Sequence, residues 1–215
     1  MKKYLYGLAA ALLLNVEGAI AQSRPNIIFF LVDDMGWQDT AVPFWDSITP
    51  ANRKFRTPNM ERLARTGMKF SNAYATPVCT PSRVSLLSGM NAARHRVTNW
   101  TSVFNTSTDG KDSLLRPPAW NANGLSPDGR QERSAYATPL PQVLRDNGYY
   151  TIMCGKAHFG TYKSIGKDPL NLGFVKNIAG SAAGHPASYF GEKNFGYNPE
   201  KYIVQADMPG MQKYY

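Results

Sequence analysis

The stretch "IIFFLVDD", residues 27–34, gives the first indication of the fold. It consists of six consecutive apolar residues, Ile27 to Val32, followed by two aspartates. An uninterrupted apolar run of this length is typical of a strand that is buried on both faces, as in a parallel sheet covered by helices. We therefore predict a strand over residues 27–32, with Asp33 and Asp34 at its carboxyl end.

Downstream of this strand, the pattern alternates helices with strands. Thr57 and Pro58 are a helix start signal, and Gly67 and Gly89 are helix stop signals. The predicted helices cover residues 58–66, 81–88 and 140–146, and the predicted further strands cover residues 68–74 and 149–154. Residues 98–132, rich in Asn, Ser, Thr, Pro and Gly, are predicted to be a long loop that shapes a binding site. This order predicts an α/β fold with a largely parallel central sheet flanked by helices.

The first 21 residues are predicted to be a secretory signal peptide. A positively charged start and an apolar stretch from Tyr4 to Leu14 precede a small-x-small cleavage site at Ala19-Ile20-Ala21. The apolar run is too short for a membrane span and soon meets Glu17. We therefore expect an exported protein, periplasmic or secreted, in which residues 22–215 belong to one domain.

The 215 residues carry a formal net charge of +9 at pH 7. A basic balance of this size suits nucleic acid, anionic membranes or acidic small substrates. No block of like charges and no alternation of arginine with aromatic residues marks a nucleic-acid groove. We therefore expect no nucleic-acid partner, and we expect most of the lysines and arginines to lie on a solvated surface.

Polar residues follow each of three predicted strands. Asp33 and Asp34 follow the first, Cys79 comes after the second, and Gly155-Lys156 follows the last. Because ligands of parallel sheets gather beyond the carboxyl ends of the strands, we expect these three groups to face one edge. Two adjacent carboxylates repel each other unless a cation or several donors neutralise them, and Ca²⁺ or Mg²⁺ prefers such oxygen ligands. The alternative is an exposed turn capped by Asp34.

The other two groups combine a thiol with positive charge. Cys79 lies at the start of a predicted helix with Arg83 one turn later, a setting that favours negative charge. Lys156 and His158 alternate along an extended segment, so both are expected to point to one side. Lys156 can carry a fixed positive charge, and His158 can exchange a proton near neutral pH. A small buried cysteine and a solvated lysine are the alternatives. A disulfide between Cys79 and Cys154 is possible in an exported chain, but Cys154 is interpreted as a buried strand residue and is not paired.

Three blocks of sequence then carry a family resemblance. They are "PNIIFFLVDDMGWQD", "TPNMERLARTGMKFSNAYATPVCTPSRVSLLSG" and "GYYTIMCGKAHFG". They resemble the N-terminal half of a type I, formylglycine-dependent sulfatase of the alkaline-phosphatase-like superfamily, and they cover most of residues 24–160. The resemblance implies an alkaline-phosphatase-like fold, of which residues 22–215 are the N-terminal part of the catalytic domain.

The element Cys79-Thr80-Pro81-Ser82-Arg83 resembles the modification signal of that family. By this resemblance, a maturation enzyme recognises Thr80 and Ser82 and oxidises Cys79 to formylglycine. The hydrated aldehyde then attacks the sulfur of a sulfate ester. The resemblance also implies that the converted residue 79 would supply an oxygen ligand to a bound metal ion.

The resemblance also implies the remaining site residues. Asp33 and Asp34 would hold Ca²⁺, with Mg²⁺ less favoured. Arg83 would steady the diol, Lys156 would contact the sulfate, and His158 would hydrogen-bond the formylglycine hydroxyl. The substrate would be a sulfated glycan or an aryl sulfate.

Two departures from the family pattern bear on this interpretation. Ala157 stands where many members have tryptophan, and full-length members are longer and supply further metal and sulfate ligands from their second half. We therefore expect the chain to be a fragment that is inactive in isolation. The alternatives are a phosphodiesterase or phosphonate monoester hydrolase of the same superfamily, and a truncated product that binds sulfated glycan without catalysis.

Four further residues of interest lie outside these blocks. Trp100 and Trp120 either stack on sugar rings or pack within the long loop. His95 and His185 are expected to be structural or to lie on the substrate side.

Overall fold

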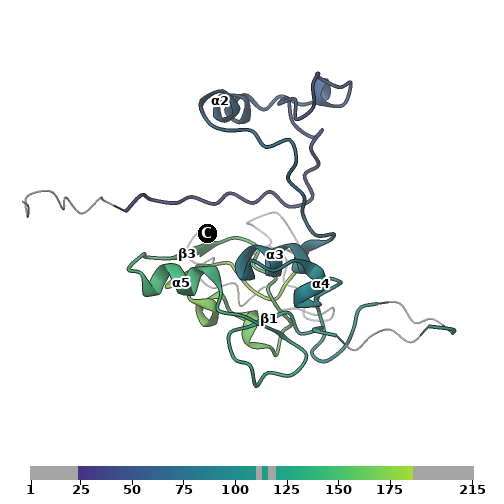
Figure 1. The fold of residues 1–215 in the computed structure, drawn as a ribbon, viewed down its shortest axis with the longest axis vertical. Coiled ribbons are helices and arrows are strands. Elements are labelled where there is room, and N and C mark those ends of the chain that lie inside the picture. The colour runs from purple at the N-terminus through teal and green to yellow at the C-terminus, as the bar shows by residue number, and fades with distance from the viewer. Residues whose placement is uncertain (1–23, 110–112, 116–119, 186–215) are drawn as a thin grey trace, which may run out of the picture. The chain divides into compact units, whose positions relative to one another are not determined.

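The computed structural model describes residues 24–109, 113–115 and 120–185. The chain divides between Leu63 and Ala64, inside one helix, into two compact units. Figure 1 shows the elements of both units as a ribbon. Within the residues that are described, no helix combines the length and the apolar character needed to cross a membrane.

The described residues of the unit Met1–Leu63 form irregular chain, the 3-10 helix η1 (Asn52–Lys54) and the first part of helix α2 (Pro58–Thr66). Its polar centre is Asn52, which is 1% exposed. The Asn52 Nδ2 donates to the carbonyls of Thr40 (2.9 Å) and Gln38 (3.2 Å), and its Oδ1 accepts from the backbone N–H of Thr49 (3.0 Å). One buried amide therefore fixes the course of the loop before α2.

Residues 27–32 form no strand, so the prediction of a buried strand there is wrong for this structure. Their side chains are exposed, Ile28 to 91% and Phe30 to 86%. A strand buried on both faces needs a neighbouring strand on each side and a cover above and below. The described residues of its own unit form no strand that could pair with it.

Helix α2 confirms the predicted helix over residues 58–66, with Pro58 at its first position. None of its residues is buried, and Leu63 is 71% exposed. The predicted strand over residues 68–74 is not formed, for the same reason as the first: among the described residues, nothing pairs with it.

The described part of the unit Ala64–Tyr215 contains five further helices. They are α3 (Cys79–Ser88), α4 (Ala92–His95), α5 (Leu140–Asp146) and the 3-10 helices η2 (Ile165–Lys167) and η3 (Pro169–Leu172). Helix α3 begins two residues before the predicted start and ends as predicted, with Gly89 in the left-handed region (φ 68°). Helix α5 has the predicted bounds. Contacts join α3 to both α4 and α5 (Figure 1).

The strands found among the described residues of this unit form two small parallel sheets. They are β1 (Leu125–Ser126) with β2 (Ala135–Tyr136), and β3 (Ile152–Cys154) with β4 (Lys176–Ile178). In the second sheet, Ile152 lies opposite Lys176 and Cys154 opposite Ile178. The mixed α/β class and the parallel pairing are as predicted. The single central sheet is not present among the described residues, and the strand predicted over residues 149–154 is shortened to β3.

A hydrophobic core joins α3 to the segment that follows β3. Its buried members are Val84, Leu87, Val97, Leu125, Ala135, Ala157, Phe159 and Leu172. The rings of Phe159 and Phe174 stack with their centroids 6.3 Å apart. Since Val84 and Leu87 belong to α3 while Ala157 and Phe159 flank His158, this core places the helix of Cys79 and the segment around His158 in one packed body.

Gly124 allows a close approach that fixes the same segment. The backbone N–H of Leu125 donates to the carbonyl of Phe159 (2.8 Å), and Gly124 pairs with Gly160 in an isolated antiparallel bridge. Gly124 has φ 84°, and a Cβ there would overlap the Phe159 carbonyl oxygen. Only glycine fits such a position, so β1 and the residues after His158 are held together by backbone contact.

Candidate active site

Cys79 is the first residue of α3, and its side chain is half-buried. The preceding residue, Val78, has φ 57°, an uncommon conformation for a β-branched side chain that turns the chain into the helix. The N–H groups of the first turn of a helix favour negative charge beside them. The thiol therefore lies where an anion would be stabilised.

Both cysteines are free thiols, so the predicted absence of a Cys79–Cys154 disulfide agrees with the structure. The prediction that Cys154 is a buried strand residue is half correct. It belongs to β3, but its side chain is exposed, because the neighbouring strand β4 covers only the edge of β3 and not its faces.

Arg83 lies one helical turn after Cys79 and is only 5% exposed. Its guanidinium Nη1 donates to the carbonyl oxygen of Lys156 over 2.7 Å. This hydrogen bond joins positions 73 residues apart in the sequence. The structure thus brings the helix of Cys79 and the segment of Lys156 together through a buried guanidinium.

Ser82 ties down the residues before the helix. Its hydroxyl donates a hydrogen bond to the carbonyl of Thr76. The Oγ1 of Thr76 in turn lies 3.0 Å from the Oγ of Ser85. Two serines of α3 therefore hold the loop that leads to Cys79.

The segment Gly155–His158 is not the regular extended stretch that the sequence suggested. Gly155 has φ 92° and His158 has φ 48°, both in the left-handed region. The prediction of an extended segment is therefore wrong at His158. Lys156 is half-buried, whereas His158 is 2% exposed and its backbone N–H donates to the carbonyl of Ser181 (2.9 Å).

His158 is oriented through a residue that sequence reasoning missed. Its Nε2 lies 2.7 Å from the carbonyl oxygen of Thr101, 57 residues away in the sequence. Because a carbonyl oxygen only accepts hydrogen bonds, Nε2 carries the proton in the neutral ring, and Nδ1 is the nitrogen with a lone pair. Thr101 comes from the Ser-, Thr- and Asn-rich loop, where no local pattern distinguishes it from its neighbours.

Thr80 completes this connection. Its Oγ1 accepts a hydrogen bond from the backbone N–H of Thr101 (3.0 Å) and lies 3.3 Å from the Thr101 hydroxyl. Thr80 is fully buried and Thr101 is 3% exposed. The residue next to Cys79 is thus linked through Thr101 to the imidazole of His158.

Gly184 is a second residue that sequence reasoning missed. A Cβ at this position would lie 3.0 Å from the Cε1 and 3.2 Å from the Nδ1 of His158. A larger residue would press on the imidazole ring, so the small residue lets the chain pass directly beside it.

His95 has a structural role. It is 1% exposed, its Nδ1 accepts from the backbone N–H of Val97 (3.0 Å), and its Nε2 therefore donates to the Oγ of Ser85 (2.9 Å). Burial lowers the pKa of His95 below its ordinary value of 6.5, and hydrogen bonds to the backbone partly oppose this effect. A neutral histidine with both nitrogens engaged stabilises the α3–α4 contact.

Asp33 and Asp34 belong to the other unit, Met1–Leu63. They lie in an exposed turn, and Asp34 has φ 56°. An exposed turn is part of the alternative interpretation of the aspartate pair, while the cap by Asp34 and the convergence of the pair with Cys79 stay predictions.

The aspartate pair fits a metal in the type of its donors. Carboxylate oxygens are what Ca²⁺ prefers, but the cation takes six to eight oxygens. Among the described residues, no group of three or more His, Cys, Asp or Glu side chains gathers in one place. Asp33 and Asp34 would therefore form only part of a calcium site.

Comparison with known proteins identifies the family. The sulfatase family model matches residues 25–209. The chain is 33% identical over 166 residues to a sulfatase of Formosa agariphila, covering 74% of this chain and 28% of that protein. It is 31% identical over 172 residues to human N-acetylgalactosamine-6-sulfatase, covering 80% of this chain and 27% of that protein. It is 27% identical over 192 residues to an arylsulfatase of Klebsiella aerogenes, covering 89% of this chain and 35% of that protein.

The chain spans about a third or less of the length of these relatives, all of which are sulfatases. The predicted resemblance is confirmed over 185 residues, from 25 to 209, which is most of the chain. The chain belongs to the sulfatase family.

Proposed function

We propose that the complete gene product containing this chain hydrolyses the sulfate ester of a sulfated carbohydrate or an aryl alcohol. In this proposal the product is exported after removal of residues 1–21, and Cys79 is converted to formylglycine. One structural observation supports this proposal in addition to family membership. The buried guanidinium of Arg83 holds the backbone of Lys156 at 2.7 Å, so the helix that begins at Cys79 and the segment ending at His158 form one unit.

A site of this kind must gather negative charge, ionise a hydroxyl and protonate a leaving alkoxide. Formylglycine supplies a hydrated aldehyde, one hydroxyl of which is the nucleophile toward sulfur. The first turn of α3 and the fixed charge of Arg83 both favour negative charge at residue 79. The loss of one such cationic contact costs about 2–4 kcal/mol of transition-state stabilisation, as for a removed oxyanion donor.

His158 is the proton acceptor in this proposal. Its Nε2 is held by the Thr101 carbonyl, which fixes the orientation of the ring, and an imidazole is the side chain that exchanges a proton most readily near neutral pH. An imidazole whose orientation is fixed by burial and by a backbone oxygen does not need to reorganise during proton transfer. Lys156 adds positive charge for the sulfate oxygens.

Asp33 and Asp34, together with an oxygen of the converted residue 79, would hold the metal. Ca²⁺ suits carboxylate oxygens in an irregular arrangement, whereas Mg²⁺ demands a more regular octahedron. Bound there, the cation would supply positive charge to the sulfate group. Further ligands would come from parts of the protein beyond this chain.

The direct test of this proposal is the chemical state of residue 79. The protein is produced in a host that contains the formylglycine-generating enzyme, and trypsin then releases the peptide of residues 70–83. We expect the mass of this peptide to show an aldehyde or its hydrate in place of the thiol. An unmodified cysteine, or a disulfide to Cys154, would contradict the proposal.

The reaction class is tested separately with the complete gene product. We expect hydrolysis of an aryl sulfate to exceed hydrolysis of an aryl phosphonate monoester, and the Cys79→Ala variant to lose activity. A preference for the phosphonate would favour the phosphodiesterase and phosphonate hydrolase branch of the superfamily. Binding of sulfated glycan without turnover would favour the non-catalytic alternative.

A further inference from the structure

The backbone of His158 has an uncommon conformation that its surroundings must hold. Its φ of 48° lies in the left-handed region, which residues other than glycine seldom occupy. A residue in such a conformation persists only where several neighbouring contacts fix it. The contacts around His158 therefore show which residues position its imidazole.

The chain that follows β4 supplies one set of these contacts. The backbone N–H of Gly155 donates to the carbonyl of Ile178 (2.8 Å), and the backbone N–H of His158 donates to the carbonyl of Ser181 (2.9 Å). Residues 155 and 178 are 23 positions apart, and so are residues 158 and 181, which means that the register of the β3–β4 pairing continues beyond the strands. The two segments are therefore bonded to each other at both ends.

Asn177 closes the turn between these two hydrogen bonds. Its Nδ2 donates to the carbonyl of Gly180 (2.8 Å), and its Oδ1 accepts from the backbone N–H of Gly180 (2.9 Å). Ala179, inside the turn, has φ 66° and is a second residue in the left-handed region. Asn177 is 8% exposed, so one buried amide fixes the path by which the chain reaches Ser181.

Two glycines allow the chain after Asn177 to pack directly against the segment of His158. A Cβ at Gly180 would lie 3.2 Å from the Cβ of Ala157. A Cβ at Gly184 would lie 3.0 Å from the Cε1 of the His158 ring. Residues 180–184 therefore pass beside both the residue before His158 and the imidazole itself.

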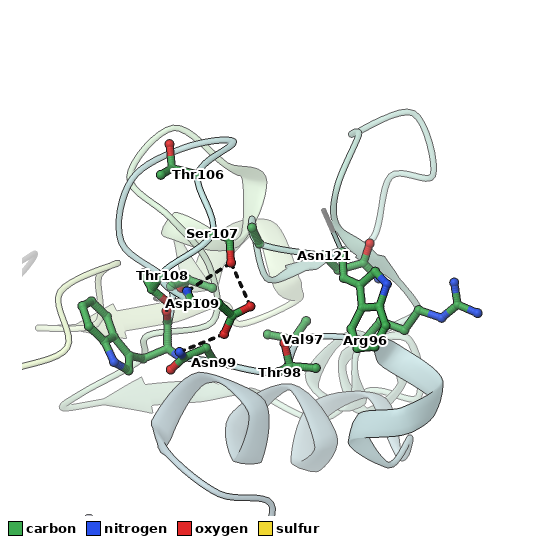
Figure 2. Close-up of a pocket in the computed structure, with 13 residues that line it drawn as sticks. Arg96, Val97, Thr98, Asn99, Thr106, Ser107, Thr108, Asp109 and Asn121 are labelled. Atoms are coloured by element: carbon green, nitrogen blue, oxygen red, sulfur yellow. Dashed lines mark hydrogen bonds between the residues drawn. The ribbon is translucent and has the colours of Figure 1, made fainter. Parts of the chain in front are cut away.

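A separate contact on the imidazole comes from Thr101, whose carbonyl oxygen lies 2.7 Å from Nε2. The loop that carries Thr101 has its own hydrogen bonds. Asp109 accepts from the Nδ2 of Asn99 (3.1 Å) and from the hydroxyl of Ser107 (2.9 Å), as the dashed lines in Figure 2 show. These bonds do not involve the turn at Asn177, so the loop and the turn hold His158 independently.

On the basis of the function proposed above, we propose that Asn177 is a positioning residue for His158. Asn177 acts through the turn. By binding both backbone groups of Gly180, it places the Ser181 carbonyl on the N–H of His158 and the chain at Gly184 beside the ring. Because an imidazole held in one orientation needs no reorganisation during proton transfer, loss of the amide should slow catalysis more than it weakens substrate binding.

The first measurement is hydrogen exchange of the His158 amide in the complete gene product, read by mass spectrometry of peptic peptides. Asn177→Ala removes both hydrogen bonds to Gly180, whereas Asn177→Asp keeps the acceptor for its N–H. We expect exchange to be fastest in Asn177→Ala, intermediate in Asn177→Asp and slowest in the unsubstituted protein. Asn171→Ala is the matched control, because it removes an amide hydrogen bond to the Ile165 carbonyl in the same unit. It should leave exchange at His158 unchanged.

The second measurement is the steady-state hydrolysis of a sulfate ester by the same variants, at a temperature at which all of them stay folded. We expect Asn177→Ala to lower kcat about tenfold or more, since a misplacement of about 1 Å can cost about a hundredfold. KM should change by less than about twofold, because ground-state binding is not affected. The pH profile of kcat should shift, and Asn177→Asp should recover part of the lost kcat.

Three outcomes would overturn the inference. Unchanged exchange at His158 in the Asn177→Ala variant would mean that the amide does not hold this residue. Faster exchange with an unchanged kcat and pH profile would mean that the turn is only structural. An equal loss of kcat in Asn171→Ala would assign the effect to general destabilisation.

The two measurements also separate this inference from the proposed function. If the unsubstituted protein hydrolyses no sulfate ester, the proposed function fails, and exchange at His158 alone decides whether Asn177 positions it. If Asn177→Ala does not fold, Asn177→Asp replaces it in both measurements, and exchange and kcat equal to those of the unsubstituted protein would overturn the inference.

Discussion

Thr80→Val is the substitution that tests the link between the modified position and the imidazole most directly. Valine has nearly the shape of threonine but cannot accept the hydrogen bond from the backbone N–H of Thr101. Thr80 is fully buried and Thr101 is 3% exposed, so water cannot replace the lost acceptor. The N–H would remain buried and unsatisfied.

The expected magnitude follows from that unsatisfied group. Leaving a buried donor without an acceptor costs about 1–3 kcal/mol, so the free energy of unfolding should fall by this amount. Thr80→Ser keeps the hydroxyl and removes one methyl group, which costs about 1 kcal/mol or less of apolar burial. We therefore expect Thr80→Val to be the more destabilising of the two.

The assay is chemical denaturation of both variants, with Thr161→Val as a matched control. The Thr161 hydroxyl is also fully buried but has no hydrogen-bond partner among the described residues, so valine should change stability little there. In the complete gene product, Thr80→Val should also displace Thr101 and shift the pH profile of kcat, because the Thr101 carbonyl fixes the imidazole of His158. The Thr80→Ser variant should keep the pH profile of the unsubstituted protein. The mass of the peptide of residues 70–83 separates this effect from reduced conversion of Cys79. A Thr80→Val variant as stable as Thr161→Val would refute the reasoning.

Three further predictions rest on separate features. Because burial lowers the pKa of His95, the unfolded chain takes up a proton below about pH 6.5 that the folded chain does not. Stability should therefore fall as the pH decreases through this range, and denaturation of a His95→Gln variant should depend less on pH; an unchanged dependence would assign the effect to other groups. Gly173→Ala should lower stability by the backbone strain at φ 96°, about 1–2 kcal/mol, and by a further ~1–3 kcal/mol because the new Cβ would overlap the backbone of Gln142 in α5. Gly89→Ala, where φ is 68° but nothing lies within 4 Å, is its control and should cost only the backbone strain, about 1–2 kcal/mol; equal losses would contradict the overlap. Asp33→Asn and Asp34→Asn should each raise the Ca²⁺ concentration needed for half-maximal activity of the complete gene product, and an unchanged requirement would place the metal elsewhere.

The helices could be predicted because their signals are local. Gly89 adopts the left-handed conformation that ends α3, and Asn147-Gly148 directly follows the last residue of α5. The predicted start of α3 was two residues too late because the N-cap is Val78 with φ 57°, and no capping preference favours valine there.

The strands were harder to predict because pairing depends on distant residues. The apolar run at 27–32 has strand composition but no partner in its unit, whereas β4, with the sequence Lys176-Asn177-Ile178, shows no alternation and yet pairs with β3. Residues 176–178 form a strand because they pair with β3, 24 positions earlier in the sequence. The local sequence pattern gives no indication of this pairing.

In the candidate site, too, contacts between near neighbours in the sequence could be predicted and contacts between distant residues could not. Cys79 and Arg83 could be placed together because a spacing of four puts them on one face of a helix. The hydrogen bond from Arg83 to Lys156 and the contact of His158 with Thr101 span 73 and 57 residues. No local rule indicates such contacts, so the tautomer of His158 and the position of Thr80 became visible only in three dimensions.

The uncovered apolar run at residues 27–32 has a practical consequence. Six adjacent uncharged side chains of high β-propensity, with no proline among them, are the type of segment that promotes intermolecular sheet formation. Preparations of this polypeptide should therefore self-associate with increasing concentration. Chymotrypsin, which cleaves at Phe29 and Phe30, should cut there early in any form of the protein that leaves the run open to solvent. The rate of cleavage at these two positions therefore measures whether residues 27–32 are covered in a given preparation.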